Sequence, residues 1–460
     1  MKFLKKPPLR LIRPLSANMF SAAFAILLWP LSAIALDFSL LPNPVEDSSY
    51  LPTTTAEVEL GQLLFWDKIL SGNKSISCGT CHHPRFGSSD GVSLGFGDGG
   101  IGVGPNRVAD PKNYPEQRVP RNSPSLYNTG ALEYTALFAD GRIEVDRLRP
   151  AGIRSPLEED MMSGFASILS AQTMFPVLSP DEMAGHYEEN GISTLVRQGR
   201  LTGPTGAWAE IAKRITDLPS YQAMFAAAYP KIKAGRPLDF TDISNAIAAF
   251  MTVEFRSDTA PFDDFLRGKA PLSPAAMRGL EFFYGEGKCS TCHAGPFMTD
   301  HDFHPIGTPQ LGPGKGERFE HHQLDIGRMR VTNKPKDRFA FRTPSLRNVT
   351  LTAPYGHAGG HLSLADFLEF HANPKEMLAA YKPQGILPKL EGSKDDWAAL
   401  KNGKDFPKIV AAVTSVPVIM TTEIRDDLLA FLASLEDPIA KSGGRLGLPK
   451  SVPSGLPIDR

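Results

Sequence analysis

The alternation of apolar and polar positions predicts a helical protein. "TTTAEVELGQLLFWDKIL" (53–70) and "LSPAAMRGLEFFYGEGK" (272–288) are each typical of an amphipathic helix that begins at a Thr or Ser cap and carries a Gly followed by aromatic residues. The stretches 220–235, 240–257 and 421–437 also have helical character. We therefore expect an all-α fold, in which the high Gly and Pro contents indicate long loops between short helices.

The first two of these helices precede two similar motifs, "CGTCHHP" from Cys78 and "CSTCHAG" from Cys289, which contain all four cysteines of the chain. Cys-x-x-Cys-His is the attachment signature of c-type haem. A four-cysteine zinc site or a pair of redox-active disulfides would explain the cysteines but not the adjacent histidines. The motifs predict two covalently bound haems, one on Cys78, Cys81 and His82 and the other on Cys289, Cys292 and His293.

The repeated combination of helix and motif predicts two cytochrome c-like domains, each with one haem. We place the N-terminal domain at 36–265 and the C-terminal domain at 266–437. Residues 438–460 are rich in Pro and Gly and have no period, so we expect either an extension draped over the surface or a disordered tail.

The N-terminus is typical of a secretory signal peptide, 1–35. Residues 1–14 are basic, 19–35 are apolar, and Ala33-Ile34-Ala35 supplies small residues for cleavage. A membrane anchor is the alternative, but an apolar run of roughly 15 residues is shorter than the ~20 that a spanning helix needs. We expect a protein of the Gram-negative periplasm with no stable membrane span. The net charge of −1, with acids and bases interspersed, argues against a nucleic-acid partner.

Longer motifs extend over most of the chain. They are "PRNSPSLYN" (120–128), "FADGR" (138–142), "AQTMFPVLSPDEMAG" (171–185) and "FRTPSLRNVTLTAPYGHAGG" (341–360). With them the sequence resembles the bacterial di-haem cytochrome c peroxidases and their relative MauG, which oxidises residues of another protein. The resemblance implies that the N-terminal haem reacts with hydrogen peroxide, that the other haem relays electrons, and that calcium lies between the domains.

The resemblance also suggests the residues that act on peroxide. The family has a glutamine and a glutamate ten residues apart, and Gln172 and Glu182 have this spacing. Glu182 would be the general acid/base that moves a proton between the two peroxide oxygens, and Gln172 would assist by hydrogen bonding. From the residues alone, Ser179 to Glu182 is equally a helix-capping box with Pro at the first helical position.

Relatives that are activated by reduction close the first haem with a histidine in the loop after its motif, whereas 84–122 contains none. The first haem should therefore be open from the start, as in the MauG-like branch. For the second haem, the family places its sixth ligand nineteen residues after the Thr of "TAP", where this chain has His371. Met377 and Tyr381 are competing ligands, and a buried histidine bonded to a carbonyl is the structural alternative.

For calcium, the resemblance implies the side chain of Asn122 and the backbone carbonyls of Thr352 and Pro354, which are oxygen donors suited to a hard cation. Two departures from the family concern electron transfer. Ala139 stands where many relatives have a tryptophan between the haems, and Gly287 stands where MauG has one that serves its protein substrate.

Three functions follow as hypotheses. The first is a peroxidase that takes electrons from a small donor, a c-type cytochrome or a cupredoxin. The second is a MauG-like oxidase of Trp or Tyr side chains in a partner protein. The third is an electron carrier without catalysis, which would need two six-coordinate haems. The resemblance also makes a homodimer possible.

Overall fold

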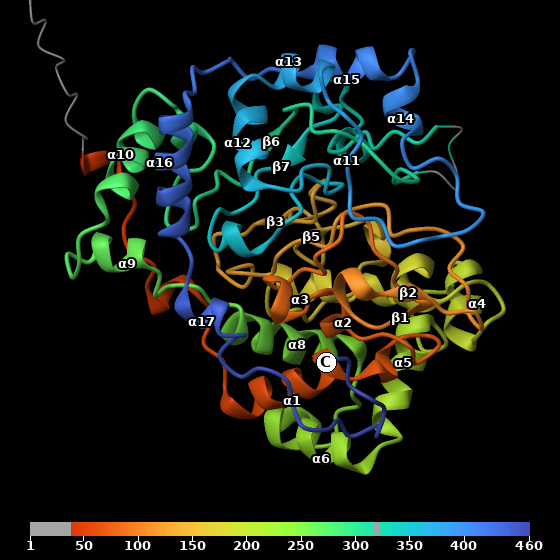
Figure 1. Cartoon of the computed structure of the whole chain (residues 1–460). Coiled ribbons are helices and arrows are strands. Elements are labelled where there is room, and N and C mark those ends of the chain that lie inside the picture. Colours follow the sequence, from red (N-terminus) through yellow and green to blue (C-terminus); the bar gives the residue numbers. More distant parts are fainter. Residues whose placement is uncertain (1–37, 317–319, 321) are drawn as a thin grey trace, which may run out of the picture. The chain divides into compact units, whose positions relative to one another are not determined.

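The computed structural model describes residues 38–460 except 317–319 and 321 (Figure 1). The predicted signal peptide, 1–35, lies outside the described residues. Within the described part of the chain, no helix is long and apolar enough to cross a membrane.

Helices dominate the described structure, as the sequence predicts. Short 3₁₀ turns lie between many of them. The α-helices are α1 Thr55–Trp66, α2 Cys78–Cys81, α3 Ile168–Thr173, α4 Gly191–Arg197, α5 Ala207–Thr216, α6 Pro219–Ala228, α7 Pro230–Lys233, α8 Phe240–Glu254, α9 Pro261–Leu266, α10 Pro274–Tyr284, α11 Met329–Thr332, α12 Leu364–Ala372, α13 Pro374–Ala379, α14 Ala398–Lys401, α15 Phe406–Ala412, α16 Thr422–Ala433 and α17 Pro438–Lys441.

The strands are only two or three residues long and form small antiparallel sheets: β1 with β2, β3 with β4 and β5, and β6 with β7. These strands connect neighbouring loops by hydrogen bonds and do not form a separate layer of the fold. Their bounds are β1 Gly100–Ile101, β2 Val108–Ala109, β3 Ala136–Leu137, β4 Ile143–Val145, β5 Ile153–Arg154, β6 Phe303–His304 and β7 Phe341–Arg342.

The predicted helix starts are confirmed. The side chain of Thr54 caps α1 in a full capping box, and Ser273 caps α10. The stretch 220–235 forms two helices instead of one, because Tyr229 adopts an extended conformation before Pro230. The residue before a proline is pushed out of the helical region by the proline ring.

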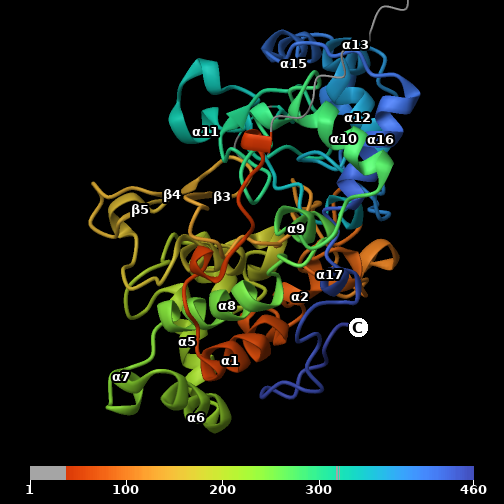
Figure 2. The same ribbon diagram turned by 90° about the vertical axis from the view of Figure 1, so that its left-hand side faces the viewer.

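Two helix pairs form the centres of the structure, α1 with α8 and α10 with α16 (Figures 1 and 2). The glycine that the two repeated helices share explains why they pack so closely. A Cβ on Gly61 of α1 would lie 1.9 Å from the Ala246 carbonyl oxygen of α8, and one on Gly279 of α10 would lie 2.0 Å from the Asp427 carbonyl oxygen of α16. Only a residue without a side chain permits these contacts.

The buried apolar residues fall into separate clusters around these pairs. The largest contains Leu60, Leu64 and Phe250, and a second contains Leu280 and Phe431. The boundary between domains at 265 remains a prediction.

The C-terminal tail lies against the N-terminal part of the chain. Val452 is buried in the largest cluster. Asp459 accepts hydrogen bonds from Lys68 Nζ and from Thr80 Oγ1, both at 2.6 Å. The tail is therefore the packed extension of the two predicted alternatives, and it reaches the helix of the first Cys-x-x-Cys-His motif.

Candidate active site

The first motif forms a short helix that presents one histidine. Cys78 and Cys81 bound α2, and His82 follows as its C-cap, with its backbone N–H donating to the Cys78 carbonyl (2.9 Å). His82 Nδ1 lies 3.0 Å from the Ser88 carbonyl oxygen, and burial lowers the pKa of the ring. A neutral imidazole whose Nδ1–H is held by a carbonyl offers Nε2 as a metal ligand. We call the surroundings of His82 the first site.

The four cysteines form no disulfide in the part of the chain that the structure describes, where all four are free. Burial raises the pKa of Cys78 and of Cys81 to about 12, which favours the thiol over the thiolate. The spacing of the two Cys-x-x-Cys-His motifs remains the basis for assigning these sulfurs to haem attachment.

The second motif lies in a 3₁₀ turn, Cys289–Thr291, rather than in an α-helix. His293 repeats the arrangement of His82, with Nδ1 3.2 Å from the Met298 carbonyl oxygen. Burial, followed by the neighbouring His371, lowers the pKa of His293 to about 4. The electrostatic effect of His371 shows that the two imidazoles lie near each other. We call the surroundings of His293 and His371 the second site.

His371 is held in place by its own helix. It lies in the last turn of α12, whose N-cap is Ser363, as predicted. Nδ1 lies 2.7 Å from the Phe367 carbonyl oxygen, and the ring packs edge-on against Phe367 with centroids 4.5 Å apart. Burial lowers its pKa, which favours the neutral ring, and the contact of Nδ1 leaves Nε2 available as a ligand atom.

The competing ligands make contacts of their own. The hydroxyl of Tyr381 donates to the carbonyl oxygens of Gly360 (2.5 Å) and Gln384 (3.2 Å). Met377 packs with the apolar cluster that contains Phe370 and Leu378. The choice of His371 over these two residues stays a prediction.

His361 is a residue that the sequence analysis missed. It is 3% exposed, and neither ring nitrogen has a hydrogen-bond partner among the described residues. Burial, together with His371, lowers its pKa to about 4. Buried polar groups are normally satisfied, so His361 is a second candidate for contact with the cofactor of this site. The only sequence signal is a histidine at the end of the "PYGHAGGH" loop.

Glu182 lies in a turn of π-helix, Pro180–Ala184, and not in the capping box that its sequence suggests. The side chain of Ser179 makes no cap hydrogen bond to this turn. The Glu182 backbone carbonyl accepts from Asp98 N–H (2.8 Å), and the carboxylate is close enough to affect the ionisation of Cys81. π-turns are frequent at functional sites. The structure therefore brings Glu182 to the first site.

The loop after the first motif supports this turn. The guanidinium of Arg107 donates to the carbonyl oxygens of Phe96 (3.0 Å), Gly97 (2.7 Å) and Gly102 (2.6 Å). These residues flank Asp98, the partner of Glu182. The loop 84–122, which contains no histidine, therefore supports the turn that carries Glu182.

Gln172 lies in the last turn of α3, in the segment before the π-turn, and the structure gives no contact between its side chain and Glu182. Lys315 is a second residue that the sequence analysis missed. Burial, aided by Arg142 and Arg121 and opposed by Glu182, lowers its pKa to about 8. A lysine of the C-terminal half therefore lies within electrostatic reach of Glu182.

A buried ion-pair network joins the loops of the two sites. Arg121, from the loop after the first motif, donates from Nε (2.6 Å) and from one Nη (2.9 Å) to Asp325, and from the other Nη (2.8 Å) to Asp140. All three residues are less than 10% exposed. The arginine lowers the pKa of Asp140 to about 2 and that of Asp325 further. Arg121 and Asp140 belong to "PRNSPSLYN" and "FADGR", so these motifs meet in space.

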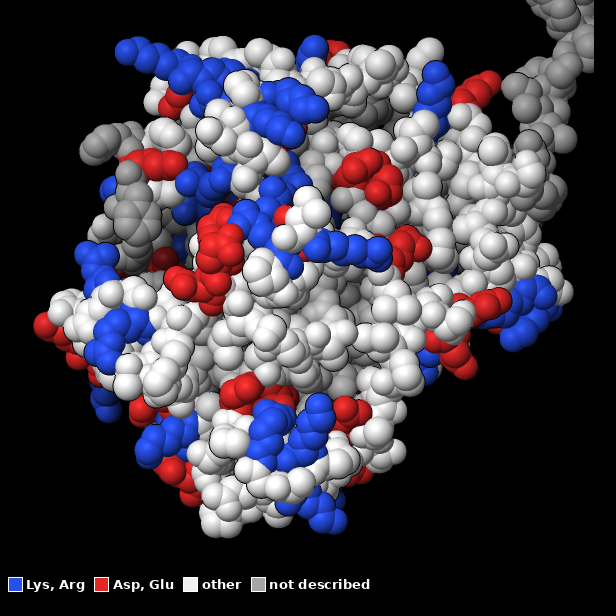
Figure 3. Space-filling view, turned by 180° about the vertical axis from the view of Figure 1, so that it is seen from behind, with Lys and Arg blue, Asp and Glu red and all other residues white. Residues whose placement is uncertain are grey.

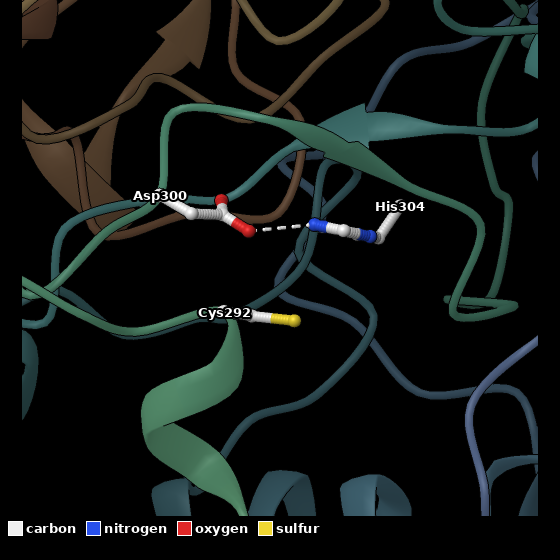
Figure 4. A group of neighbouring side chains, drawn as sticks. All are labelled: Cys292, Asp300 and His304. Atoms are coloured by element: carbon white, nitrogen blue, oxygen red, sulfur yellow. Dashed lines mark hydrogen bonds and ion pairs between the residues drawn. The ribbon is translucent and has the colours of Figure 1, made fainter.

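A histidine–carboxylate pair lies beside Cys292 (Figure 4). His304 Nε2 is 2.8 Å from Asp300 Oδ2, and Cys292 points toward the same nitrogen, so that the three ligand atoms lie within 4.8 Å of one another. Cys292 followed by Asp300 raises the pKa of His304 to about 9. Such a group can hold a metal, but its sulfur is the one that the motif assigns to haem attachment. We therefore treat the pair as part of the second site.

The donor atoms expected for calcium are available. Asn122 Nδ2 donates to the carbonyl oxygens of Val92 (2.7 Å) and Ser93 (3.3 Å), which leaves Oδ1 for another partner. Within the described residues, the carbonyls of Thr352 and Pro354 accept no hydrogen bond. Neutral oxygen donors of this kind fit a hard cation.

The structure combines a helical fold with two Cys-x-x-Cys-His motifs. Neutral histidines lie beside the motifs, and a glutamate lies at the first of them. This is the arrangement of a c-type redox protein with two haems. The family model for di-haem cytochrome c peroxidase matches residues 55–271. The chain belongs to this family.

Two relatives and one solved structure illustrate the similarity. Cytochrome-c peroxidase IdrP1 of Denitromonas iodatirespirans is 30% identical over 357 residues, covering 72% of this chain and 76% of the relative. Methylamine utilization protein MauG of Methylorubrum extorquens is 27% identical over 396 residues, covering 86% and 82%. A MauG-like protein associated with microbial copper homeostasis is 26% identical, with a TM-score of 0.56, covering 87% of this chain and 95% of that structure.

Proposed function

We propose that the protein is a periplasmic peroxidase with two covalent haems, which reduces hydrogen peroxide with electrons from a small redox protein. The observation that carries the proposal is the placement of Glu182 in a supported π-turn at the first site. His82 with Cys78 and Cys81 would hold one haem, and His293 with Cys289, Cys292 and His371 would hold the other. The haem irons supply the redox chemistry that splits the peroxide bond and accepts electrons.

Glu182 handles the protons of this reaction. As a carboxylate it takes a proton from one oxygen of bound hydrogen peroxide, and as a carboxylic acid it delivers that proton to the other oxygen, which leaves as water. Gln172 orients the peroxide by hydrogen bonding. Lys315 lies within electrostatic reach of Glu182 and places a positive charge near it.

The second site accepts electrons from the donor. His293 and His371 would each offer an imidazole nitrogen to the second haem. Two nitrogen ligands stabilise oxidised iron relative to a histidine–methionine pair, so such a site would have a low potential. A c-type cytochrome or a cupredoxin is the donor we expect. Acidic and basic side chains are mixed over the face in Figure 3, with lysines and arginines gathered in its upper part.

A MauG-like oxidase is the second candidate. Two observations favour it: the loop 84–122 has no histidine to close the first site, and the second site has a histidine where peroxidases have methionine. In this function, Trp or Tyr side chains of a partner protein supply the electrons. The third hypothesis, an electron carrier, does not explain why a glutamate is held in a partly buried π-turn at the first site.

Two further expectations accompany the proposal. Export would remove residues 1–35, and one calcium ion would lie on Asn122, Thr352 and Pro354. A homodimer is possible by analogy with the family.

Stopped-flow absorbance tests the proposal. The fully oxidised protein is mixed with one equivalent of hydrogen peroxide, and the spectrum should change rapidly without prior reduction. Decay of the new spectrum with reduced cytochrome c supports the peroxidase, whereas decay with a partner protein and loss of its Trp or Tyr supports the oxidase. A reaction that requires half-reduced protein would refute the open first site.

A further inference from the structure

One arginine close to the second motif lacks the carboxylate that a buried arginine usually has. Nε of Arg342 is buried and has no hydrogen-bond partner among the described residues. Nη1 donates to the Thr343 carbonyl oxygen, at the long distance of 3.2 Å. Arg347, five residues further along, instead donates to the buried carboxylate of Asp263 (2.8 Å). A partly buried charge without a partner is costly, so Arg342 points to a negatively charged ligand.

The ionisation of Arg342 leads to the same conclusion. Burial lowers its pKa, and the neighbouring group that opposes this effect is the phenol of Tyr134 rather than a carboxylate. An arginine side chain nevertheless stays protonated in a protein and offers five N–H donors in a planar fork. The guanidinium therefore keeps a positive charge that no Asp or Glu of the described residues balances.

The backbone of Arg342 fixes it beside the loop that follows the second motif. Arg342 lies in β7 and pairs with Phe303 of β6, the strand that comes after His293 in the chain. On its other side, the Arg342 N–H donates to the Ala139 carbonyl oxygen (2.8 Å). Arg342 is thus held between the loop of the second motif and the segment 138–142.

Tyr134 supports the guanidinium and offers a further donor. The guanidinium carbon lies 5.5 Å from the centre of the Tyr134 ring, and this ring packs against His301 (4.5 Å) and Phe297 (6.0 Å) from the loop of the second motif. The Tyr134 hydroxyl is buried without a hydrogen-bond partner among the described residues, and the nearby Ser345 donates to the Phe297 carbonyl oxygen (2.6 Å). Burial raises the pKa of Tyr134, so the hydroxyl keeps its proton.

We propose that Arg342 binds a propionate group of the second haem, with the Tyr134 hydroxyl as a second donor. A haem attached through its vinyl groups keeps two propionates, and arginine binds a carboxylate through two parallel hydrogen bonds. The inference rests on the proposed attachment at Cys289 and Cys292. Pairing with the guanidinium offsets negative charge close to the second site, which favours reduced iron and so raises the potential of this haem.

Spectroelectrochemical titration of the haem-loaded protein tests this contact. In Arg342→Met, the ratio of reduced to oxidised second haem at a fixed potential should fall about 10-fold, which lowers the midpoint by about 59 mV. Arg328→Met is the matched control. Arg328 lies over Phe303, the strand partner of Arg342 (4.2 Å), but already has a carboxylate, Glu144 (2.6 Å). An unchanged midpoint in Arg342→Met, or an equal shift in the control, overturns the proposal.

The pH dependence distinguishes a bound carboxylate from a simple effect of charge. Without Arg342 the propionate loses the cation that favours its ionised form, so its pKa rises. The difference in midpoint between Arg342→Met and the wild type should therefore be largest at pH 8 and should shrink as the pH falls toward 5. His301 and Glu133 are present in both proteins, so their titration cancels. A difference that stays constant with pH overturns the proposal.

Arg342→Lys gives a second variant in case the loss of the whole side chain disturbs the fold. It keeps the positive charge but not the planar fork, so its midpoint should lie between those of the wild type and Arg342→Met. A midpoint equal to that of Arg342→Met, with both haem spectra intact, contradicts a role for the charge of this side chain.

Two further measurements separate the possible sources of the negative charge. A wild-type midpoint that follows the chloride concentration at constant ionic strength would assign Arg342 to a small anion from solution and overturn the proposal. The mass of the intact protein should correspond to two haems per chain. A chain without the second haem would refute its attachment together with the propionate contact, whereas two haems and an unchanged midpoint in Arg342→Met would refute the contact alone.

Discussion

The two Cys-x-x-Cys-His sites share one local arrangement and differ in what faces it. In both, a partly buried histidine bonds through Nδ1 to a backbone carbonyl five or six residues ahead. At the first site the nearby side chains are Glu182 and Lys315, which carry charge and protons. At the second they are His371 and His361, which are neutral. The motif places the iron ligand, and the surrounding chain decides whether the site reacts with a substrate or passes electrons.

The largest expected effect comes from breaking the buried ion-pair network around Arg121. Arg121 links the loops of both sites through Asp140 and Asp325. Arg121→Met leaves the buried Asp325 without its ion-pair partner and leaves Asp140 with Arg142 alone, which should cost about 3–5 kcal/mol of unfolding free energy. Urea denaturation measures it. Arg149→Met, which removes exposed ion pairs to Glu158 and Glu159, is the control and should cost at most ~1 kcal/mol. Equal losses in both variants would contradict the role of the network.

The same network predicts how stability depends on pH. Because the folded-state pKa of Asp140 is about 2, below the ordinary value of 3.8, its contribution is present above about pH 4 and is lost as the pH falls through 2. Urea titrations between pH 5 and pH 2 should therefore show a loss of stability that is smaller in Asp140→Asn. An identical pH profile in the variant would show that Asp140 contributes nothing.

Replacing the carboxyl group of Glu182 should make the first site resemble the haem site of a protein that only carries electrons. Glu182→Gln keeps the shape of the side chain but removes the titrating oxygen, so the reaction with peroxide should slow by ~10²-fold or more, with nearly intact spectra. Stopped-flow kinetics measure the rate. Glu188→Gln, an exposed neighbour, is the matched control. A wild-type rate in Glu182→Gln would return this residue to a structural role.

At the second site, the two histidines can be distinguished by spin state. His371→Ala should convert the second haem from low spin to high spin, whereas His361→Ala should leave it low spin. Absorbance and magnetic circular dichroism report the change. The opposite pattern would make His361 the ligand, and no change in either variant would point to a different residue.

The smallest effect concerns Lys315. Because its pKa is about 8, it loses its charge as the pH rises through 8, and the positive charge that it places near the first site is lost with it. The peroxide rate should fall over this range by up to ~10-fold. Lys315→Met should lack this pH dependence and should have the low rate throughout. A variant that retains the same dependence would exclude Lys315.

The sequence predicts what local patterns encode. Helix starts at Thr54, Ser273 and Ser363 follow from capping residues and periodicity, and the attachment residues follow from their spacing. The π-turn at Glu182 does not follow, because Ser-Pro-Asp-Glu has the local pattern of a helix start. Its actual conformation depends on Asp98, in a loop distant in sequence.

Tertiary contacts explain the other differences. His361 becomes notable only when the fold buries it without partners. Asp325 lies 204 residues from Arg121, and the tail has no period, yet Asp459 fits between Lys68 and Thr80. No local pattern identifies such contacts in advance.

Electron paramagnetic resonance of the oxidised, haem-loaded protein tests the contrast between the sites most directly. We expect one high-spin ferric signal from the first site, for which no second protein ligand is proposed, and one low-spin signal from the second site, for which two histidines are proposed. Two low-spin signals would mean that a residue closes the first site, and the assignment of the two regions to different tasks would be wrong.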